Sequence, residues 1–290
     1  MIVEFRIPLP MKLEEFDKGW LYMVASASED VSKGGDGGVT VLKNEPYDNT
    51  DGHLGTSEIS GNVIPKNKGQ YTLKQYFLGS RVPSWLSYLI PGDMFFLYEE
   101  AWNAFPNCIT ILTSKYFSNK KVRISVATNF FEGDPGINEN AHDLNKEDLA
   151  ARKVIDLDIA DQLKDDKDYN AKYDPALVKL EKAGRGPLEK GWMKLPGVNP
   201  VMTAYKLIRV DFKVWGVQSR VENVIIENQK KMFLKTHGQA FAQLDEYIEM
   251  SMDDIRVMED KAQAEMSKLR MEQEAAKGED AKKPAAAAAQ

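Results

Sequence analysis

Short β-strand patterns that follow one another closely dominate the first half of this sequence. The first pattern is Ile2–Ile7, where apolar residues alternate with Glu4 and Arg6 as in a strand that buries one face. Consecutive strands joined by short links favour an antiparallel sheet. The other strand candidates, in order, are Val39–Leu42, Gln70–Phe77, Met94–Glu99, Asn107–Tyr116, Val122–Thr128, Val154–Ile159 and Val201–Val214.

Helical periodicity replaces strand alternation toward the C-terminal end of the sequence. Apolar residues recur at helical spacing from Ser219 to Met250, which predicts one long amphipathic helix lying across the sheet. A second helix is predicted to begin at Ser251, because Ser251 and Asp254 resemble a capping box, and to continue to Leu269. The apolar stripe of this second helix also needs a surface to pack against.

A chain of 290 residues, 43% of them hydrophobic, can bury one large core, so we expect a single domain over residues 1–275. Two segments rich in Gly, Asp and Asn, Lys33–Gly38 and Asp48–Gly69, are too polar to pack inside and are predicted as surface loops. From residue 276 to 290 the chain consists mainly of Ala, Lys, Gly, Glu and Pro. This segment has no large apolar residue to bury and is predicted to be a disordered tail.

The formal charge of the chain is −6, from 38 Lys and Arg against 44 Asp and Glu. An acidic chain argues against a nucleic-acid partner and against docking through a polybasic patch, so we expect any membrane contact to be mainly apolar. The densest apolar stretch, Trp85–Ile90, is too short to span a membrane and ends at Pro91. The single cysteine, Cys108, excludes an internal disulfide framework and is typical of a reducing, cytoplasmic setting.

Residues that could carry out catalysis are scattered. His53, His142 and His237 share no metal-ligand spacing with one another or with Cys108. No serine-nucleophile motif and no phosphate-binding glycine loop is present. Cys108 lies in strand-like surroundings, where a small buried apolar side chain is a better interpretation than a nucleophile. We therefore expect no catalytic residue, no metal and no cofactor.

Two polar positions, Lys206 and Glu259, fall within or beside apolar faces, and a buried polar group needs a partner or a ligand. Lys206 shares one face of its strand with apolar residues, which suggests an enclosed anion. Glu259 borders the apolar stripe of the last helix, although a solvated flank position explains it equally well. Thr72 and Lys74 project to the same face of their strand, which an ordinary strand surface would also explain.

Several uncommon strings occur together in this sequence. They are, in order, Asn44-Glu45-Pro46-Tyr47, Gly69-Gln70-Tyr71-Thr72, Ala101-Trp102-Asn103-Ala104-Phe105-Pro106, Gly184-Arg185-Gly186-Pro187-Leu188, Ala204-Tyr205-Lys206-Leu207 and Met252-Asp253-Asp254-Ile255-Arg256. With these strings in this order, the chain resembles the class I phosphatidylinositol transfer proteins from about Ile2 to Leu269. The resemblance implies an α+β helix-grip fold of the START-like type, in which a curved, mostly antiparallel β-sheet and long helices enclose a lipid cavity. It also implies that the bound phospholipid is cargo.

The resemblance assigns roles to particular residues. For membrane contact it implies Val214 and Trp215, after the Lys206 strand, and Trp85 and Leu86, near the lipid-exchange loop of the family. For the lipid headgroup it implies Thr72, Lys74, Glu99, Asn103, Thr110, Thr128, Lys206 and Glu259, of which Thr128 is placed by strand alternation.

Four residues depart from the family pattern. Trp20 replaces a polar headgroup-pocket residue, and Val214 replaces one tryptophan of a membrane-facing pair. Thr236 occupies an aromatic position linked with choline lipids, and Leu180 occupies the position of a phosphorylatable serine. These departures bear on headgroup preference, membrane anchoring and regulation.

The expected partners are phosphatidylinositol, a second phospholipid such as phosphatidylcholine, and a membrane surface that is contacted transiently by a cytoplasmic monomer. A second hypothesis is a lipid-presenting or lipid-sensing module that supplies phosphatidylinositol to lipid kinases. A third, an enzyme acting on the enclosed lipid, would need a nucleophile, and the sequence offers none beyond Cys108.

Overall fold

The computed structural model describes residues 1–31, 39–77, 96–114, 121–258, 260, 261 and 264. The sequence predictions for Trp85, Leu86, Glu259, the glycine-rich loop at 33–38 and the tail at 276–290 lie outside these residues. Within them, no helix is long and apolar enough to cross a membrane.

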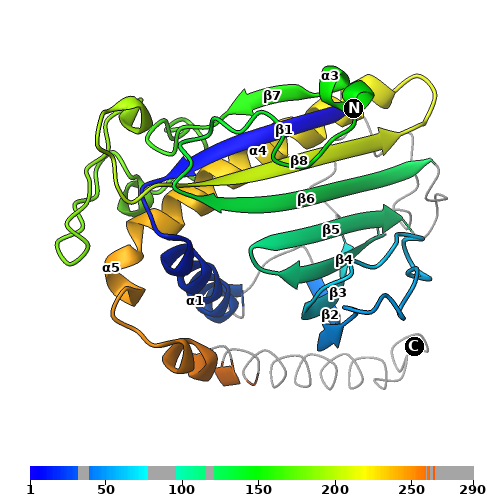
Figure 1. Cartoon of the computed structure of the whole chain (residues 1–290), viewed down its shortest axis with the longest axis horizontal. Coiled ribbons are helices and arrows are strands. Elements are labelled where there is room, and N and C mark those ends of the chain that lie inside the picture. Colours follow the sequence, from blue (N-terminus) through cyan, green and yellow to red (C-terminus); the bar gives the residue numbers. More distant parts are fainter. Residues whose placement is uncertain (32–38, 78–95, 115–120, 259, 262–263, 265–290) are drawn as a thin grey trace, which may run out of the picture.

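The described strands form one sheet in the order β2-β3-β4-β5-β6-β8-β1-β7 (Figure 1). Every neighbouring pair is antiparallel except β1 and β7, which are parallel. The α+β fold with a mostly antiparallel sheet is thereby confirmed. The bounds are β1 Ile2–Leu9, β2 Val39–Asp48, β3 Lys68–Phe77, β4 Phe96–Ala104, β5 Asn107–Ser114, β6 Val122–Glu132, β7 Lys153–Asp156 and β8 Met202–Phe212.

Most of the described strands differ from their predicted bounds, and β6 continues past Thr128 to Glu132. β2 continues to Asp48 through Pro46, which an edge strand tolerates because a missing N–H on its outer side breaks no ladder hydrogen bond. β4 continues to Ala104, since the half-polar string after Glu99 still pairs with β5. β7 ends at Asp156, and the following Leu157 and Ile159 are buried without being part of a strand.

Helix α1, Leu13–Val31, was not anticipated from the sequence. Its signals are present: Glu14 and Glu15 lie in the first turn, and Phe16 and Met23 are seven residues apart on the face that enters the core. The remaining helices are α3 Lys146–Ala151, α4 Gln218–Ala242 and α5 Leu244–Tyr247, with short 3-10 turns at η3 Ala171–Tyr173 and η4 Trp192–Lys194.

The long helix predicted from Ser219 to Met250 is broken into α4 and α5 at Gln243. The break turns Leu244 and Tyr247 fully into the core, where Tyr247 Oη donates a hydrogen bond to the carbonyl oxygen of Ala240 over 2.7 Å. The predicted capping box at Ser251 is confirmed. Ser251 Oγ accepts from the N–H of Asp254 over 3.1 Å, the Asp254 carboxylate accepts from the N–H of Ser251 over 2.8 Å, and residues 252–258 are helical.

The core lies on one face of the sheet, under α1 and α4 (Figure 1). Phe5 of β1 meets Phe233 of α4 with ring centroids 5.4 Å apart, and Phe16 of α1 meets Phe130 of β6 at 5.1 Å. We call this side the inner face. It continues across β3, β4 and β5, where the described residues become more polar.

Candidate functional site

Strand register brings the predicted headgroup residues onto the inner face. Asn103, Cys108, Thr128 and Lys206 form one row across β4, β5, β6 and β8, and Phe5 of the core is the next member of that row on β1. A row one step along the strands contains Thr72, Ala101 and Thr110, and the next contains Lys74 and Glu99. All the predicted headgroup residues within the described part of the chain therefore share one face, although the sequence from the first, Thr72, to the last, Lys206, spans more than 130 positions.

Lys206 is a buried ammonium group among aromatic rings. Its Nζ lies 5.0 Å from the ring centroid of Phe233, 5.6 Å from that of Phe130 and 6.0 Å from that of Trp20. Its one hydrogen bond within the described residues is a long one, donated to Thr128 Oγ1 over 3.4 Å. Burial lowers the pKa of Lys206 to about 8, because the ammonium has lost its water. An anion at this position would supply the missing partner.

His237 lies beside Lys206 but is not an anion and cannot be the missing partner of the ammonium group. Its ring is stacked on Phe16 with centroids 5.6 Å apart, and Nδ1 is 2.8 Å from the carbonyl oxygen of Phe233. Burial, and then the positive charge of Lys206, lower the pKa of His237 to about 3. The imidazole is therefore neutral near pH 7, and its Nε2 is buried without a partner among the described residues.

A second polar group occupies β3 and β4. Lys74 Nζ lies 3.3 Å from Glu99 Oε1, with both side chains partly buried. Tyr76, the next inward residue of β3, has its pKa raised by burial and then by the charge of Glu99, so its phenol stays protonated. The phenol therefore stays hydrogen-bonded to the Glu99 carboxylate and belongs to the same polar group as Lys74 and Glu99.

The hydroxyl of Thr72 is unsatisfied. Its Oγ1 is buried and has no hydrogen-bond partner among the described residues, which is uncommon for a buried polar atom. Asn103 is exposed, at the end of the same strand pair, and makes only a long hydrogen bond to the carbonyl oxygen of Gln70, 3.4 Å. Thr72 thus lies inside the polar region and Asn103 at its margin.

The predicted membrane residues that can be described lie in the turn after β8. Trp215 is 98% exposed, whereas Val214 is partly buried. The turn is closed by a hydrogen bond from the N–H of Val217 to the carbonyl oxygen of Val214, 3.4 Å, and Gly216 has a φ of 83° that favours glycine.

The other departures from the family pattern have clear locations. Trp20 stacks on Phe16 at 6.3 Å and faces Lys206, so an aromatic ring stands where a polar group was expected. Thr236 is partly buried, and its hydroxyl donates to the carbonyl oxygen of Met232 within α4 over 2.9 Å. Leu180 is buried in the core.

Sequence reasoning missed two polar clusters that connect the elements around the site. Glu15 of α1 accepts two hydrogen bonds from Arg185, of 2.6 and 2.9 Å, which ties the start of the helix to the Gly-Arg-Gly string. On the outer face, Glu100 accepts from the Ser57 hydroxyl over 2.7 Å and from the Tyr71 hydroxyl over 2.9 Å. Arginine between two glycines was the available signal for the first cluster.

The outer face also carries a cavity of about 310 Å³. Its floor is a row of four apolar side chains, Trp102, Ile109, Ala127 and Leu207, which alternate with the inward-facing residues. The cavity therefore lies on the opposite side of the sheet from the predicted headgroup residues. No group of three or more His, Cys, Asp or Glu placed to hold a metal occurs among the described residues.

Comparison with known proteins extends over nearly the whole chain. Residues 1–264 match the family model described as phosphatidylinositol transfer protein. Phosphatidylinositol transfer protein 1 of Dictyostelium discoideum is 40% identical over 268 residues, which cover 92% of this chain and 95% of the relative. The beta isoform of Rattus norvegicus is 40% identical over 274 residues, covering 93% and 94%. Cytoplasmic phosphatidylinositol transfer protein 1 of Drosophila melanogaster is 36% identical over 265 residues, covering 91% and 89%.

Proposed function

Because the chain belongs to the phosphatidylinositol transfer protein family, we propose that it binds one phosphatidylinositol against the inner face of the sheet and exchanges it between membranes. Phosphatidylcholine is the second cargo we propose. The lipid is carried unchanged, so the protein acts without a cofactor and without a catalytic residue.

The observation that carries the proposal is the shared face of Thr72, Lys74, Glu99, Thr128 and Lys206. A lysine without a carboxylate partner lies at one side of this region, and an unsatisfied hydroxyl and a Lys–Glu pair lie at the other. Such an arrangement suits a ligand that carries one anionic phosphate and several hydroxyls. A phosphatidylinositol headgroup has both.

A physical barrier explains why such a protein is needed. A phospholipid that leaves a bilayer alone exposes its acyl chains at about 0.8 kcal/mol per methylene, over roughly thirty methylenes. An apolar surface that replaces the bilayer removes most of this cost. Lys206 then pairs with the phosphate, and the hydroxyl, amide and carboxylate groups replace water around the inositol. Choline has no hydroxyl to use these groups.

We further propose that residues 1–275 form the transfer domain of a cytoplasmic monomer that contacts membranes through Trp215, Val214, Trp85 and Leu86. Presentation of phosphatidylinositol to a lipid kinase is the alternative. Transfer of labelled phosphatidylinositol between two vesicle populations, with no kinase present, separates the two functions, because only a transfer protein accelerates it.

Thr72→Ala tests the headgroup assignment. We expect this variant to transfer phosphatidylinositol about tenfold more slowly, or slower still, while its rate of phosphatidylcholine transfer persists. The reason is that a hydrogen bond in a dry site contributes about 1.5 to 3 kcal/mol. Its melting temperature should hardly change, since the hydroxyl has no partner within the described protein. Glu259→Ala should show the same selectivity.

Thr113→Ala is the matched control, because Thr113 is also a buried threonine of the sheet but alternates to the outer face of β5. It should leave the ratio of the two transfer rates unchanged. Equal loss of both lipids in Thr72→Ala would show that Thr72 supports the cavity as a whole and does not select inositol.

A further inference from the structure

Two lysines oppose each other at the end of the sheet that carries Trp215. Lys213 follows β8 and Lys121 precedes β6, and the N–H of Lys213 donates to the carbonyl oxygen of Lys121 over 2.7 Å. Both residues are exposed. Alternation from the neighbouring Arg123–Asp211 pair places both side chains on the outer side of the strands. Like charges directly opposite each other destabilise a sheet, so this pair is unfavourable unless an anion lies beside it.

Among the described residues, no carboxylate forms an ion pair with Lys121 or Lys213. Asp211 is exposed and lies opposite Arg123, which in turn donates to Asn62 over 2.6 Å. Glu222 is buried below the strand end, where it accepts from Gln218 over 3.1 Å. The sequence contains no Asp or Glu at all from 115 to 123 or from 213 to 220. A local positive charge therefore exists within a chain of net charge −6.

The lysine pair lies next to the most exposed aromatic residue of the described chain. Trp215 is two residues beyond Lys213, and its indole is 98% exposed on a turn that begins where β8 ends (Figure 1). An indole with adjacent lysines is the combination that suits the boundary between lipid headgroups and acyl chains of an anionic bilayer. Basic residues without an aromatic neighbour would not favour a bilayer over other anions in this way.

We propose that Lys121 and Lys213 form a cationic rim beside Trp215 that selects membranes carrying anionic phospholipids. The inference rests on the proposed transfer function and identifies which membranes the protein docks to. It adds a local basic contribution to the mainly apolar membrane contact that the sequence predicts. At physiological ionic strength the Debye length is about 8 Å, so a docked membrane responds to this local rim and much less to the distant acidic surface.

The expected effect is measurable in vesicle binding. A lysine at an anionic membrane surface contributes about 1 kcal/mol, which is about fivefold in partitioning, and two lysines give about 25-fold. The test compares sedimentation of the protein with vesicles of phosphatidylcholine alone and with vesicles that also contain phosphatidylserine. Wild-type protein should prefer the second kind, and raising the salt concentration should reduce the preference.

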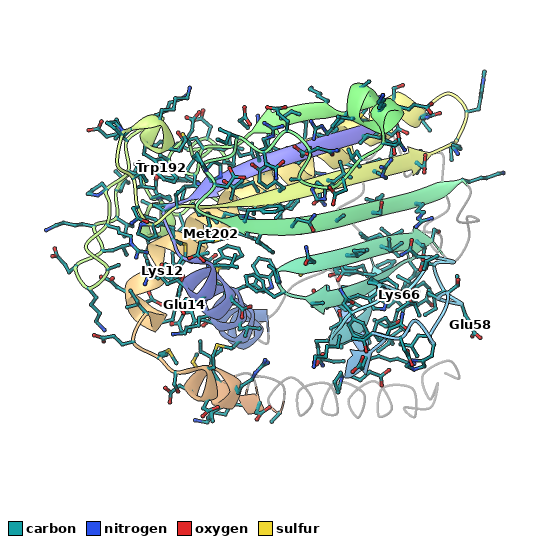
Figure 2. All side chains as sticks on the ribbon, viewed as in Figure 1. Lys12, Glu14, Glu58, Lys66, Trp192 and Met202 are labelled. Carbon is teal, nitrogen blue, oxygen red and sulfur yellow. The ribbon has the colours of Figure 1, made fainter. Side chains whose placement is uncertain are left out.

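The test variant is Lys121→Gln/Lys213→Gln, and the matched control is Lys164→Gln/Lys194→Gln. The control removes the same charge from two other exposed lysines. Lys194 belongs to η4 with Trp192, which lies at the opposite end of the sheet from the end of β8 (Figure 2). The test variant should lose the preference for phosphatidylserine and keep its melting temperature, while the control keeps both. Equal losses in the two double variants would show that only net charge matters and would overturn the proposal.

Two further outcomes separate this inference from the transfer function. Transfer between vesicles of phosphatidylcholine alone should proceed at the wild-type rate in Lys121→Gln/Lys213→Gln, since no anionic surface is present. A wild-type protein that transfers lipid but shows no preference for phosphatidylserine would overturn the rim while leaving the transfer function intact. An acidic protein would then be the better candidate for the anion. Failure of all transfer by the wild type would instead remove the proposed function.

Discussion

Lys206 is a residue whose protonation should depend on the ligand. A free lysine has a pKa of 10.5, and burial lowers that of Lys206 to about 8. Below about pH 8 the ammonium is charged in both the folded and the unfolded chain, and burying it costs about 3 kcal/mol. As the pH rises from about 8 to about 10.5 the folded chain releases this proton before the unfolded chain does, so lipid-free protein should become more stable relative to a variant without the lysine.

Thermal melting of lipid-free wild type and Lys206→Met across this pH range measures the effect. As the pH rises, the melting temperature of the wild type should increase steadily relative to that of Lys206→Met. Loading with phosphatidylinositol should abolish the trend, because the lipid phosphate stabilises the ammonium. A constant difference across the range would mean that Lys206 reaches water in the lipid-free protein.

Individual site residues were predictable to different degrees. Alternation alone identified Lys206 as a lysine on an apolar face, since a strand repeats every two residues. Thr128 came from the resemblance and was placed by the same rule, and its register opposite Lys206 puts it on the inner face. Glu99 and Thr110 came from the resemblance alone, because an isolated polar residue on a strand does not reveal which residue lies opposite it. The enclosure of Lys206 by Trp20 depends on a helix that the strand patterns did not indicate.

The contact between α1 and α5 depends on a glycine. A Cβ at Gly19 would lie 2.5 Å from Cζ of Tyr247, a ring that is fully buried and hydrogen-bonded to Ala240. Gly19→Ala should therefore destabilise the protein by about 1 to 3 kcal/mol in urea unfolding, even though alanine favours a helix by about 1 kcal/mol over glycine.

A double-mutant cycle supplies the control for the Gly19 prediction. In a Tyr247→Leu background the added methyl group meets no ring, so Gly19→Ala should become neutral or stabilising by up to about 1 kcal/mol. If Gly19→Ala had the same effect in both backgrounds, the two residues would not be coupled and the close helix contact would be wrong.

Helices and strands were not equally visible in the sequence. Strand alternation located each of the described strands, because one apolar face repeats along it. Helix α1 was missed because its apolar residues are interrupted by Gly19 and by the partly exposed Trp20. The break at Gln243 was missed because Leu244 and Tyr247 continue the helical spacing of α4, although their burial comes from a change of direction.

The arrangement of the whole sheet lies beyond what strand patterns can specify. β1 pairs with β8, about 200 positions later, and with β7 in parallel. Alternation reveals which residues of each strand face inward but not which strand is its neighbour. The resemblance implied a curved, mostly antiparallel sheet without an order of strands, and the described sheet confirms the antiparallel architecture.

Docking of the whole molecule is expected to depend on Trp215. Its side chain is 98% exposed and packs against nothing, so Trp215→Ala should leave the melting temperature and the amount of copurifying lipid unchanged. Transfer between vesicles should slow by about tenfold, because burying a large apolar side chain in the interface contributes about 1.5 to 3 kcal/mol. Leu195→Ala is the control, since Leu195 is 57% exposed and directly follows η4, whose Trp192 lies at the opposite end of the sheet (Figure 2). Lipid content is measured by mass spectrometry and transfer by the movement of labelled phosphatidylinositol. An unchanged transfer rate in Trp215→Ala, or an equal slowing in Leu195→Ala, would place the docking surface elsewhere on the molecule.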